Sequence, residues 1–238
     1  MKTNQSNESI YKFIGRARTP FNEKFGIPRQ ASLLEKIECQ IEIHPPYHRR
    51  EAFNGLEKVS HLWILSDFNL SKSSKLSVKP PRLGGNKKLG VFATRSPSRP
   101  NSIGLSLVQL KGIEFKNKKT ILTTSGIDLV DQTPIIDIKP YLNYSDSPNL
   151  ASQSWIDQIE FIPFDSINYS TQFLAKIEEM NKEAAKRLID LVEIVFSEDP
   201  RPAYQNQDDR VYKMRIMNCD LHWLVKNQNV EVLDIQFN

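Results

Sequence analysis

The stretch KTILTTSGIDLVDQTPIIDI (Lys119–Ile138) holds two short runs rich in β-branched residues, with a turn-forming segment between them. Lys119–Thr124 and Thr133–Ile138 are each too short for a stable helix, and their isoleucine and threonine residues favour extended backbone. Gly126 marks the interruption as a turn. We therefore predict two strands here, joined by a loop that carries two aspartates.

Similar runs recur through the first two-thirds of the chain. The other strands predicted there are Ile10–Arg16, Glu38–Ile43, Ser60–Phe68, Leu89–Ala93 and Ile103–Leu110, with one short helix at Arg49–Leu56. Glycine, proline and asparagine bound these runs, and no helix alternates with them regularly. Strands at this spacing predict a β-barrel or a β-sandwich, and the repeated βαβ pattern of a parallel sheet is absent.

A composition change marks a second unit. The segment SDSPNLASQS (Ser145–Ser154) is small and polar, as domain boundaries often are. Beyond it we predict a strand near Gln158–Ile162, a helix capped by Ser170 or Thr171, and a second helix through Leu188–Phe196. The last predicted strands are Val211–Met217, Asp220–Val225 and Val230–Phe237. The domains are therefore placed at residues 10–149, a β domain, and residues 155–238, a small α+β domain.

The composition is that of an ordinary globular protein. Of 238 residues, 39% are hydrophobic and 25% are charged, and no apolar run is long enough to cross a bilayer. The polar start, Met1–Ser9, lacks the apolar stretch of a secretory signal. Cys39 and Cys219 belong to no CxxC pair, so we expect two buried thiols in a reducing compartment. These features predict a cytoplasmic protein.

Positive charge is concentrated in the middle of the sequence. Lys72–Lys119 contains twelve lysines and arginines against a single acid, Glu114. Phosphate backbones bind such clusters through counterion release, although the lysine-rich pieces also fit a solvated loop. Arg82, Arg95 and Arg99 lie among Gly, Pro and Asn residues, where a shaped backbone favours a binding role.

Nucleotide and metal motifs are missing. The nine glycines include no GxG, and no Walker A loop is present, so a Rossmann-type site is not expected. His44 and His48 are separated by Pro45-Pro46, which prevents the helix that would align them on a metal. His61 lies in the apolar run VSHLWIL and is expected to be a core histidine. No metal site is predicted.

Three segments have the composition of a binding site. FGIPRQ (Phe25–Gln30) places an arginine and an amide beside a proline, and PPRLGGNKKLGVFATRSPSRPNSIG (Pro80–Gly104) carries the three arginines. Within Ser125–Tyr141, Asp128 follows a predicted strand, where a carboxylate can bind ribose hydroxyls or an ammonium group. Capping a turn is an equally good role for Asp131. Asp137 alternates with isoleucines, as an outward residue of a strand does.

These segments, with VSHLWILSDF (Val59–Phe68) and the C-terminal SEDPRPAY (Ser197–Tyr204), closely resemble the TsaA-like family of TrmO-type tRNA methyltransferases. The resemblance runs in order over nearly the whole chain. It implies a homodimer whose N-terminal antiparallel β-barrel binds S-adenosylmethionine without a Rossmann fold. It also implies methylation of N6 of threonylcarbamoyl-adenosine beside the anticodon, at position 37 of threonine tRNAs.

The resemblance also implies site residues, by matching motif positions. The expected cofactor contacts are Pro28, Arg29, Gln30, Asp67, Phe68, Arg95, Leu105, Ser125, Gly126, Ile127 and Asp128. Two positions depart from the usual pattern: Ser102 replaces a proline in RPNPIG, and Gln132 replaces a glycine after DLVD. These changes leave the placement of Asp131 open.

A mechanism follows as a hypothesis. The substrate nitrogen attacks the sulfonium methyl in line, and Asp128 or Asp131 accepts its proton. The threonyl carboxylate of the substrate is a natural partner for Arg82 or Arg99, with Asn101 beside them. We expect the basic run to hold the anticodon stem-loop and the C-terminal domain to extend that contact as a tRNA-binding accessory. Neither DNA nor a membrane is an expected partner. The rival hypotheses are a non-catalytic RNA-binding barrel and a methyltransferase acting on another RNA.

Overall fold

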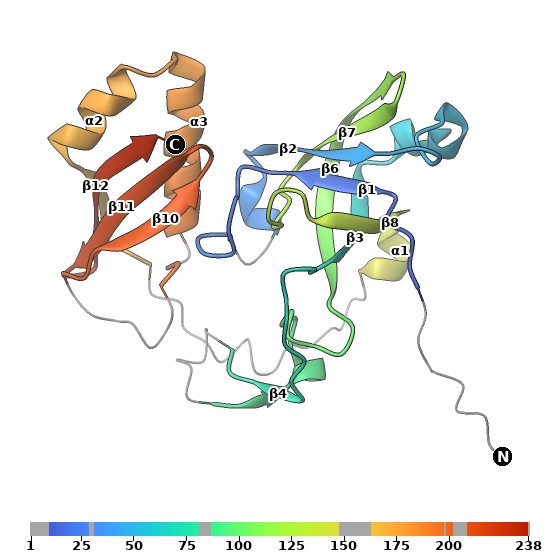
Figure 1. Ribbon diagram of the computed structural model, residues 1–238, viewed down its shortest axis with the longest axis horizontal. Helices are drawn as coiled ribbons and strands as arrows, with labels where there is room; N and C mark the ends of the chain where they lie inside the picture. Colours follow the sequence, from blue (N-terminus) through green and yellow to red (C-terminus); the bar gives the residue numbers. More distant parts are fainter. Residues whose placement is uncertain are drawn as a thin grey trace.

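Six antiparallel strands close into a barrel. The computed structural model describes residues 10–28, 31–80, 87–147, 163–197, 199–201 and 209–237. The barrel strands are β1 (Gly15–Arg18), β2 (Glu38–Ile43), β3 (His61–Asp67), β6 (Ile103–Lys116), β7 (Lys119–Ser125) and β8 (Pro134–Pro140). They are joined in the order β1-β2-β7-β6-β3-β8, and every pairing is antiparallel. The predicted β-barrel class is confirmed (Figure 1).

Alternation along each strand separates the interior of the barrel from its outer face. On β3, Leu62, Ile64 and Ser66 are fully buried while their neighbours are partly exposed. Register then fixes the partners, because Ile64 lies opposite Ser106 and Ser66 lies opposite Gly104. Since side chains of directly paired residues share a face of the sheet, both serines point into the barrel.

Several predicted elements have different bounds in the structure. The first strand is Gly15–Arg18 rather than Ile10–Arg16, since Ile10 is 99% exposed and has no partner strand to cover it. The predicted helix at Arg49–Leu56 is two 3-10 turns, Arg50–Phe53 and Leu56–Lys58. β6 is fourteen residues long, because a bulge between Leu110 and Gly112 lets it bend and continue pairing with β7.

An insertion separates β3 from β6. It carries a two-stranded ribbon, β4 (Ser77–Val78) with β5 (Leu89–Gly90), and a 3-10 turn at Val91–Ala93. The predicted strand Leu89–Ala93 is therefore correct for its first two residues only. In Figure 1 this insertion extends from the end of the barrel where β3 finishes and β6 begins.

After the short helix α1 (Asn143–Asp146), the C-terminal part forms the predicted α+β domain. β9 (Ser166–Tyr169), β10 (Tyr212–Ile216), β11 (Cys219–Lys226) and β12 (Asn229–Phe237) form a sheet in the order β10-β11-β12-β9, with β9 parallel to β12. Its helices are α2 (Thr171–Glu178) and α3 (Lys182–Phe196). The Ser170 hydroxyl caps α2 by accepting from the Phe173 amide at 3.0 Å.

Two details of this domain follow from local sequence. Asn227 and Gln228 form the turn between β11 and β12 with φ of 49° and 62°, the left-handed geometry of a tight two-residue hairpin turn. β9 was not predicted, and the predicted strand Gln158–Ile162 lies outside the described residues. Across the described parts of the chain, no helix is both long and apolar enough to span a membrane.

The predictions for the lone cysteines and for Asp137 are confirmed, whereas the one for His61 is wrong. Cys39 and Cys219 are both free and buried, and burial raises the pKa of each thiol to about 11. The Asp137 side chain points outward and pairs with Lys139 at 3.0 Å. His61 is only half-buried and contacts the neighbouring Ser60 hydroxyl at 3.0 Å, because it occupies an outward position of β3.

Candidate active site

Asp128 is the most distinctive ionisable group of the barrel domain. It lies just beyond β7, and the Ser106 hydroxyl inside the barrel donates to its Oδ1 at 2.5 Å. Burial raises the pKa of the Asp128 carboxyl above its usual value, while the Ser106 hydrogen bond and the positive charge of Arg95 oppose that rise. A carboxyl held this way is a better proton acceptor than an exposed aspartate once it is ionised.

Buried hydroxyls without partners lie at the same end of the barrel. Ser66 Oγ and Thr124 Oγ1 are enclosed, yet neither has a hydrogen-bond partner within the structure. Gly104 lies so close to Ser66 and to the Phe68 ring that a side chain there would collide with both. Buried polar atoms left unpaired are costly unless something else bonds to them, so these residues fit a small polar ligand.

The Ser125–Ile127 segment can offer a ligand mainly its backbone. Ser125 and Ile127 are buried, and Ile127 packs in the hydrophobic core. Gly126 has φ of 68°, and a side chain at this position would collide with the carbonyl of Ala31. Glycine is therefore required where this loop turns against the segment that begins at Ala31.

Asp131 is the other candidate proton acceptor, and both of its carboxylate oxygens already accept hydrogen bonds. Its Oδ1 accepts from the Thr19 amide at 3.1 Å, and its Oδ2 accepts from the Gln132 side chain at 2.7 Å. Gln132 adopts φ of 67°, a conformation in which glycine is less strained than a residue with a side chain. The geometry therefore favours Asp128 over Asp131 as a group available to a ligand.

The arginines of the insertion lie beside this end of the barrel. Arg95 is exposed, and its charge reaches Asp128. Arg99 is half-buried and donates from Nη1 to the Thr94 carbonyl at 3.1 Å, which fixes the loop and leaves other guanidinium nitrogens unused in the described structure. Asn101 is exposed at the base of the loop, where its carbonyl accepts from the Ile103 amide at 2.7 Å.

Two predicted cofactor residues lie on the other side of the barrel wall. Asp67 and Leu105 occupy outward positions of β3 and β6, and Leu105 is 48% exposed. The Phe68 ring, by contrast, lies against Gly104. A single ligand contacts Asp67, Leu105 and Asp128 together only if it lies over the rim of the barrel or if a second molecule completes the site.

Some predicted residues cannot be placed. Arg29, Gln30 and Arg82 lie outside the described residues. Pro28 is described and buried. The segment before it is tied to the insertion, because Lys24 Nζ donates to the Leu70 carbonyl at 2.5 Å.

The fold divides the basic run into two groups. The strand β6 runs between the insertion and the β6–β7 turn, and its fourteen residues would span at most about 40 Å if fully extended. The insertion carries Lys72, Lys75, Lys79, Lys87, Lys88, Arg95 and Arg99, and no acid of the described residues lies within salt-bridge distance of them. At the other end, Lys119 pairs with Glu42 at 2.6 Å and Lys116 pairs with Glu114 at 3.2 Å. Lys111 and Lys118 have no such partner among the described residues, so the second group is neutralised by these residues only in part, whereas the first group is not neutralised by them at all.

Sequence reasoning missed Ser66 and Ser106. Each is a small polar residue at an inward position of an otherwise apolar strand, in WILSDF and GLSLV. A polar residue in phase with the buried face was the available signal. Among the residues that the structure describes, no group of three or more His, Cys, Asp or Glu side chains is arranged to hold a metal ion.

Comparison with known proteins assigns the chain to a family. The family model of the tRNA-methyltransferase O N-terminal domain matches residues 16–147, and that of the TrmO C-terminal domain matches residues 163–238. The chain belongs to the TrmO family.

Individual TrmO relatives are similar over their whole length. The tRNA (adenine(37)-N6)-methyltransferase of Escherichia coli is 36% identical over 233 residues, covering 95% of this chain and 97% of that protein. A Pseudomonas aeruginosa relative, named among the S-adenosylmethionine-dependent methyltransferases, is 41% identical and covers 93% of this chain and 95% of its own. A crystal structure of TrmO from P. aeruginosa superposes with a TM-score of 0.78, at 34% identity over 100% of both chains.

Proposed function

We propose that this chain methylates N6 of threonylcarbamoyl-adenosine at position 37 of threonine tRNAs. Membership in the TrmO family makes it a tRNA methyltransferase that uses S-adenosylmethionine. The observation that carries the site assignment is the buried Asp128 carboxyl, bonded to Ser106 and reached by the charge of Arg95.

Asp128 has the properties that the reaction needs. The substrate N6 is urea-like, so it is a poor nucleophile until its proton leaves. S-adenosylmethionine, when bound, supplies an electrophilic methyl group on a sulfonium sulfur. Asp128 accepts the N6 proton as nitrogen forms a bond to the methyl carbon and the carbon–sulfur bond breaks, so that S-adenosylhomocysteine leaves. The Ser106 hydroxyl holds the accepting carboxylate in place.

The arginines of the insertion suit the anionic groups of the reactants. The charge of Arg95 reaches Asp128, and a planar guanidinium near that carboxyl can bind the carboxylate of the cofactor's methionine part. Arg99, anchored to the Thr94 carbonyl, presents its remaining donors to the threonyl carboxylate of the substrate. The carboxylate of the cofactor and the carboxylate of the substrate are thus each assigned to a different arginine.

The insertion is the proposed surface for the anticodon stem-loop. Lys72, Lys75 and Lys79 are exposed and have no acidic neighbour among the described residues. Phosphates bind such cations with release of counterions, and position the RNA without reading its sequence. Unpaired loop bases, such as that of position 37, can be splayed toward a pocket beside such a surface.

A homodimer is part of the proposal. Leucines occupy outward positions of neighbouring strands, with Leu65 opposite Leu105 and Trp63 opposite Leu107. Leu105 is 48% exposed, and the nearby insertion exposes 75% of Phe92. An outward apolar strip of this kind suits a self-complementary interface. The compartment we propose is the cytoplasm, where tRNA is modified.

Nucleoside mass spectrometry of tRNA tests the function. We expect a deletion strain to lose only the methylated threonylcarbamoyl-adenosine, and to regain it with the wild-type gene but not with Asp128→Asn. Loss of a different methylated nucleoside would point to another RNA substrate. If the purified protein is stabilised against heat by RNA but not by S-adenosylhomocysteine, the non-catalytic RNA-binding barrel is correct instead.

A further inference from the structure

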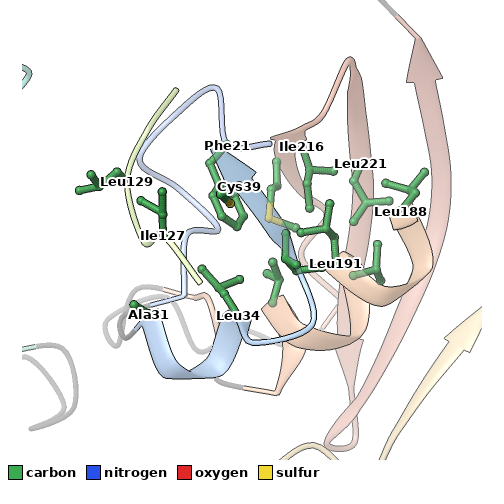
Figure 2. Packing of buried hydrophobic residues seen from close by; sticks show 14 of the residues in the cluster. Phe21, Ala31, Leu34, Cys39, Ile127, Leu129, Leu188, Leu191, Ile216 and Leu221 are labelled. Atoms are coloured by element: carbon green, nitrogen blue, oxygen red, sulfur yellow. The ribbon is translucent and has the colours of Figure 1, made fainter. Parts of the chain in front are cut away.

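The hydrophobic core is continuous between the barrel and the C-terminal domain. Figure 2 shows Phe21, Leu34 and Cys39 on the barrel side packing toward Leu191 of α3 and Ile216 of β10. All five are at most 2% exposed. Interfaces between independent domains are usually more polar than this, so the C-terminal domain is fixed against the barrel rather than tethered to it.

Polar contacts hold the same junction in one register. Phe21 forms a β-bridge with Ile216, and the Met217 amide donates to the Pro20 carbonyl at 2.8 Å. The Arg215 amide donates to the Glu23 carboxylate at 2.8 Å. The segment before FGIPRQ is therefore attached edge-on to the C-terminal sheet.

The barrel residues in this junction flank the candidate cofactor loops. The 3-10 turn Ala31–Leu34 begins directly after Pro28–Gln30, and its Leu34 is fully buried in the shared core. Ile127 and Leu129, which bracket Asp128 in sequence, belong to the same hydrophobic core as Ala31 and Leu34, and Figure 2 shows Ile127 on the side of the segment that faces Phe21 and Leu34. The turn that follows Pro28–Gln30 and the segment that contains Asp128 are thus both packed into a core that α3 and β10 complete.

We propose that the C-terminal domain positions the cofactor loops of the barrel, with Leu191 and Ile216 as positioning residues for Asp128. The inference rests on the proposed function and goes beyond a role in gripping tRNA. Without α3 and β10, the apolar side chains Phe21, Leu34 and Ile127 would face water, and the loops that carry them would lose their packing. Loops have few contacts of their own, so their order depends on such support.

A hydrogen bond between the two domains allows the junction to be tested with a substitution that disturbs the core less. Arg187, on the exposed side of α3, donates from Nη2 to the Glu38 carbonyl at 3.1 Å, at the start of β2. Removing this side chain deletes a contact between the domains without opening a cavity. Arg187→Ala therefore tests the junction in a protein that folds normally.

The experiment compares Leu191→Ala with Val232→Ala in the full-length protein. Val232 is fully buried in the same domain, but it pairs with Trp223 and Tyr169 within the C-terminal sheet. Calorimetry measures the affinity for S-adenosylhomocysteine, filter binding measures the affinity for tRNA, and hydrogen exchange follows the amides of residues 31–34 and 126–129. Melting temperatures show that both variants are folded at the temperature used.

We expect Leu191→Ala to weaken S-adenosylhomocysteine binding about tenfold and to speed exchange in both loops, with tRNA affinity within about twofold of wild type. Arg187→Ala shifts cofactor affinity in the same direction by about two- to threefold, Leu191→Met restores it, and Val232→Ala leaves it unchanged. Unchanged cofactor affinity and loop exchange in Leu191→Ala would overturn the proposal, as would an equal loss in Val232→Ala. If the wild type itself fails to bind S-adenosylhomocysteine, the proposed function fails, and loop exchange alone decides whether the domain positions these loops.

Discussion

The two ends of the barrel are built from the same strands but differ in how their polar groups are satisfied. At the Asp128 end, Ser66 Oγ is buried without a partner and the adjacent insertion leaves its cations without acidic neighbours in the described structure. At the opposite end, Phe53 and Phe115 stack edge to face at 5.8 Å, and Arg50 lies 4.3 Å above the Phe115 ring.

Both ends therefore hold a buried polar atom without a partner in the described structure, because His48 Nδ1 is also unpaired near the start of β7. The Asp128 end is distinguished by its two unpaired hydroxyls and by the carboxyl that Ser106 bonds. The far end does have a hollow of about 420 Å³, lined by Arg50, Phe53, Lys111 and Phe115 among others. Arg50 lies over the Phe115 ring and the nearby Lys116 pairs with Glu114, whereas Lys111 has no acidic partner among the described residues. The hollow lacks a buried carboxyl such as Asp128, so it is a poorer candidate for the active site.

The largest effect should come from Asp128→Asn. Because an amide cannot accept the proton, we expect the single-turnover rate of methyl transfer to fall about 10²- to 10⁴-fold, with S-adenosylhomocysteine affinity retained. Asp137→Asn, which alters an outward carboxylate of β8, is the matched control and should keep the wild-type rate. A comparable loss in Asp131→Asn but not in Asp128→Asn would make Asp131 the proton acceptor.

Arg95→Ala should have the second largest effect, which is a loss of affinity for the cofactor. Losing a charge-assisted contact weakens binding by roughly ten- to a hundredfold, which titration calorimetry with S-adenosylhomocysteine will measure. Arg95→Lys keeps the charge but not the planar fork, so an intermediate affinity is expected. Wild-type affinity in Arg95→Ala would remove this residue from the cofactor site.

A smaller effect should distinguish the two basic groups. The triple change of Lys72, Lys75 and Lys79 to Gln is expected to weaken tRNA binding about tenfold and to flatten its salt dependence, because three phosphate contacts are lost. The same change of Lys111, Lys116 and Lys118, at the far end of β6, should alter affinity by less than about twofold. Filter binding at several salt concentrations gives both quantities, and equal losses would show that both ends contact the RNA.

The smallest expected effect is a shift in the pH at which the rate of methyl transfer begins to fall. Asp128 accepts a proton only when ionised, and burial raises its pKa, so the rate should begin to fall at a higher pH than an ordinary aspartate would cause. The same raised pKa means that the folded state binds this proton more tightly than the unfolded chain. The contribution of Asp128 to stability should therefore increase as the pH falls, while the rate decreases.

Rate profiles and melting temperatures of wild type and Asp128→Asn measure the two trends. In Asp128→Asn, neither the acidic fall of the rate nor the acidic gain in stability that Asp128 causes should remain. If the acidic limb of the rate profile persists in Asp128→Asn, it belongs to another group.

The barrel was predictable because its strands carry the signal locally. Glu38–Ile43 has the predicted bounds, and the helix N-cap at Ser170 was one of two candidates. β9 was missed because four residues with little alternation acquire strand structure only by pairing with β12. Register, which places Ser106 beside Asp128, is a property of strand pairing that no local pattern contains.

The predicted basic run shows the same limit, because a local sequence pattern does not reveal how strands distribute charge in space. Lys72–Lys119 is one basic run in sequence, but β6 carries its two halves to opposite ends of the barrel. Conversely, the family resemblance leads us to expect a glycine at position 132, and the structure gives Gln132 a positive φ, which glycine adopts with less strain.

The junction through Phe21 and Ile216 also bears on synthesis of the chain. Asn22 donates to the Met217 carbonyl across 195 residues, so the two sides of this contact leave the ribosome far apart in time. Contacts between such distant residues form late, after both local units have collapsed. A nascent polypeptide can therefore close its barrel early, yet the segment leading to Pro28 gains its final neighbours only after β10 has been synthesised.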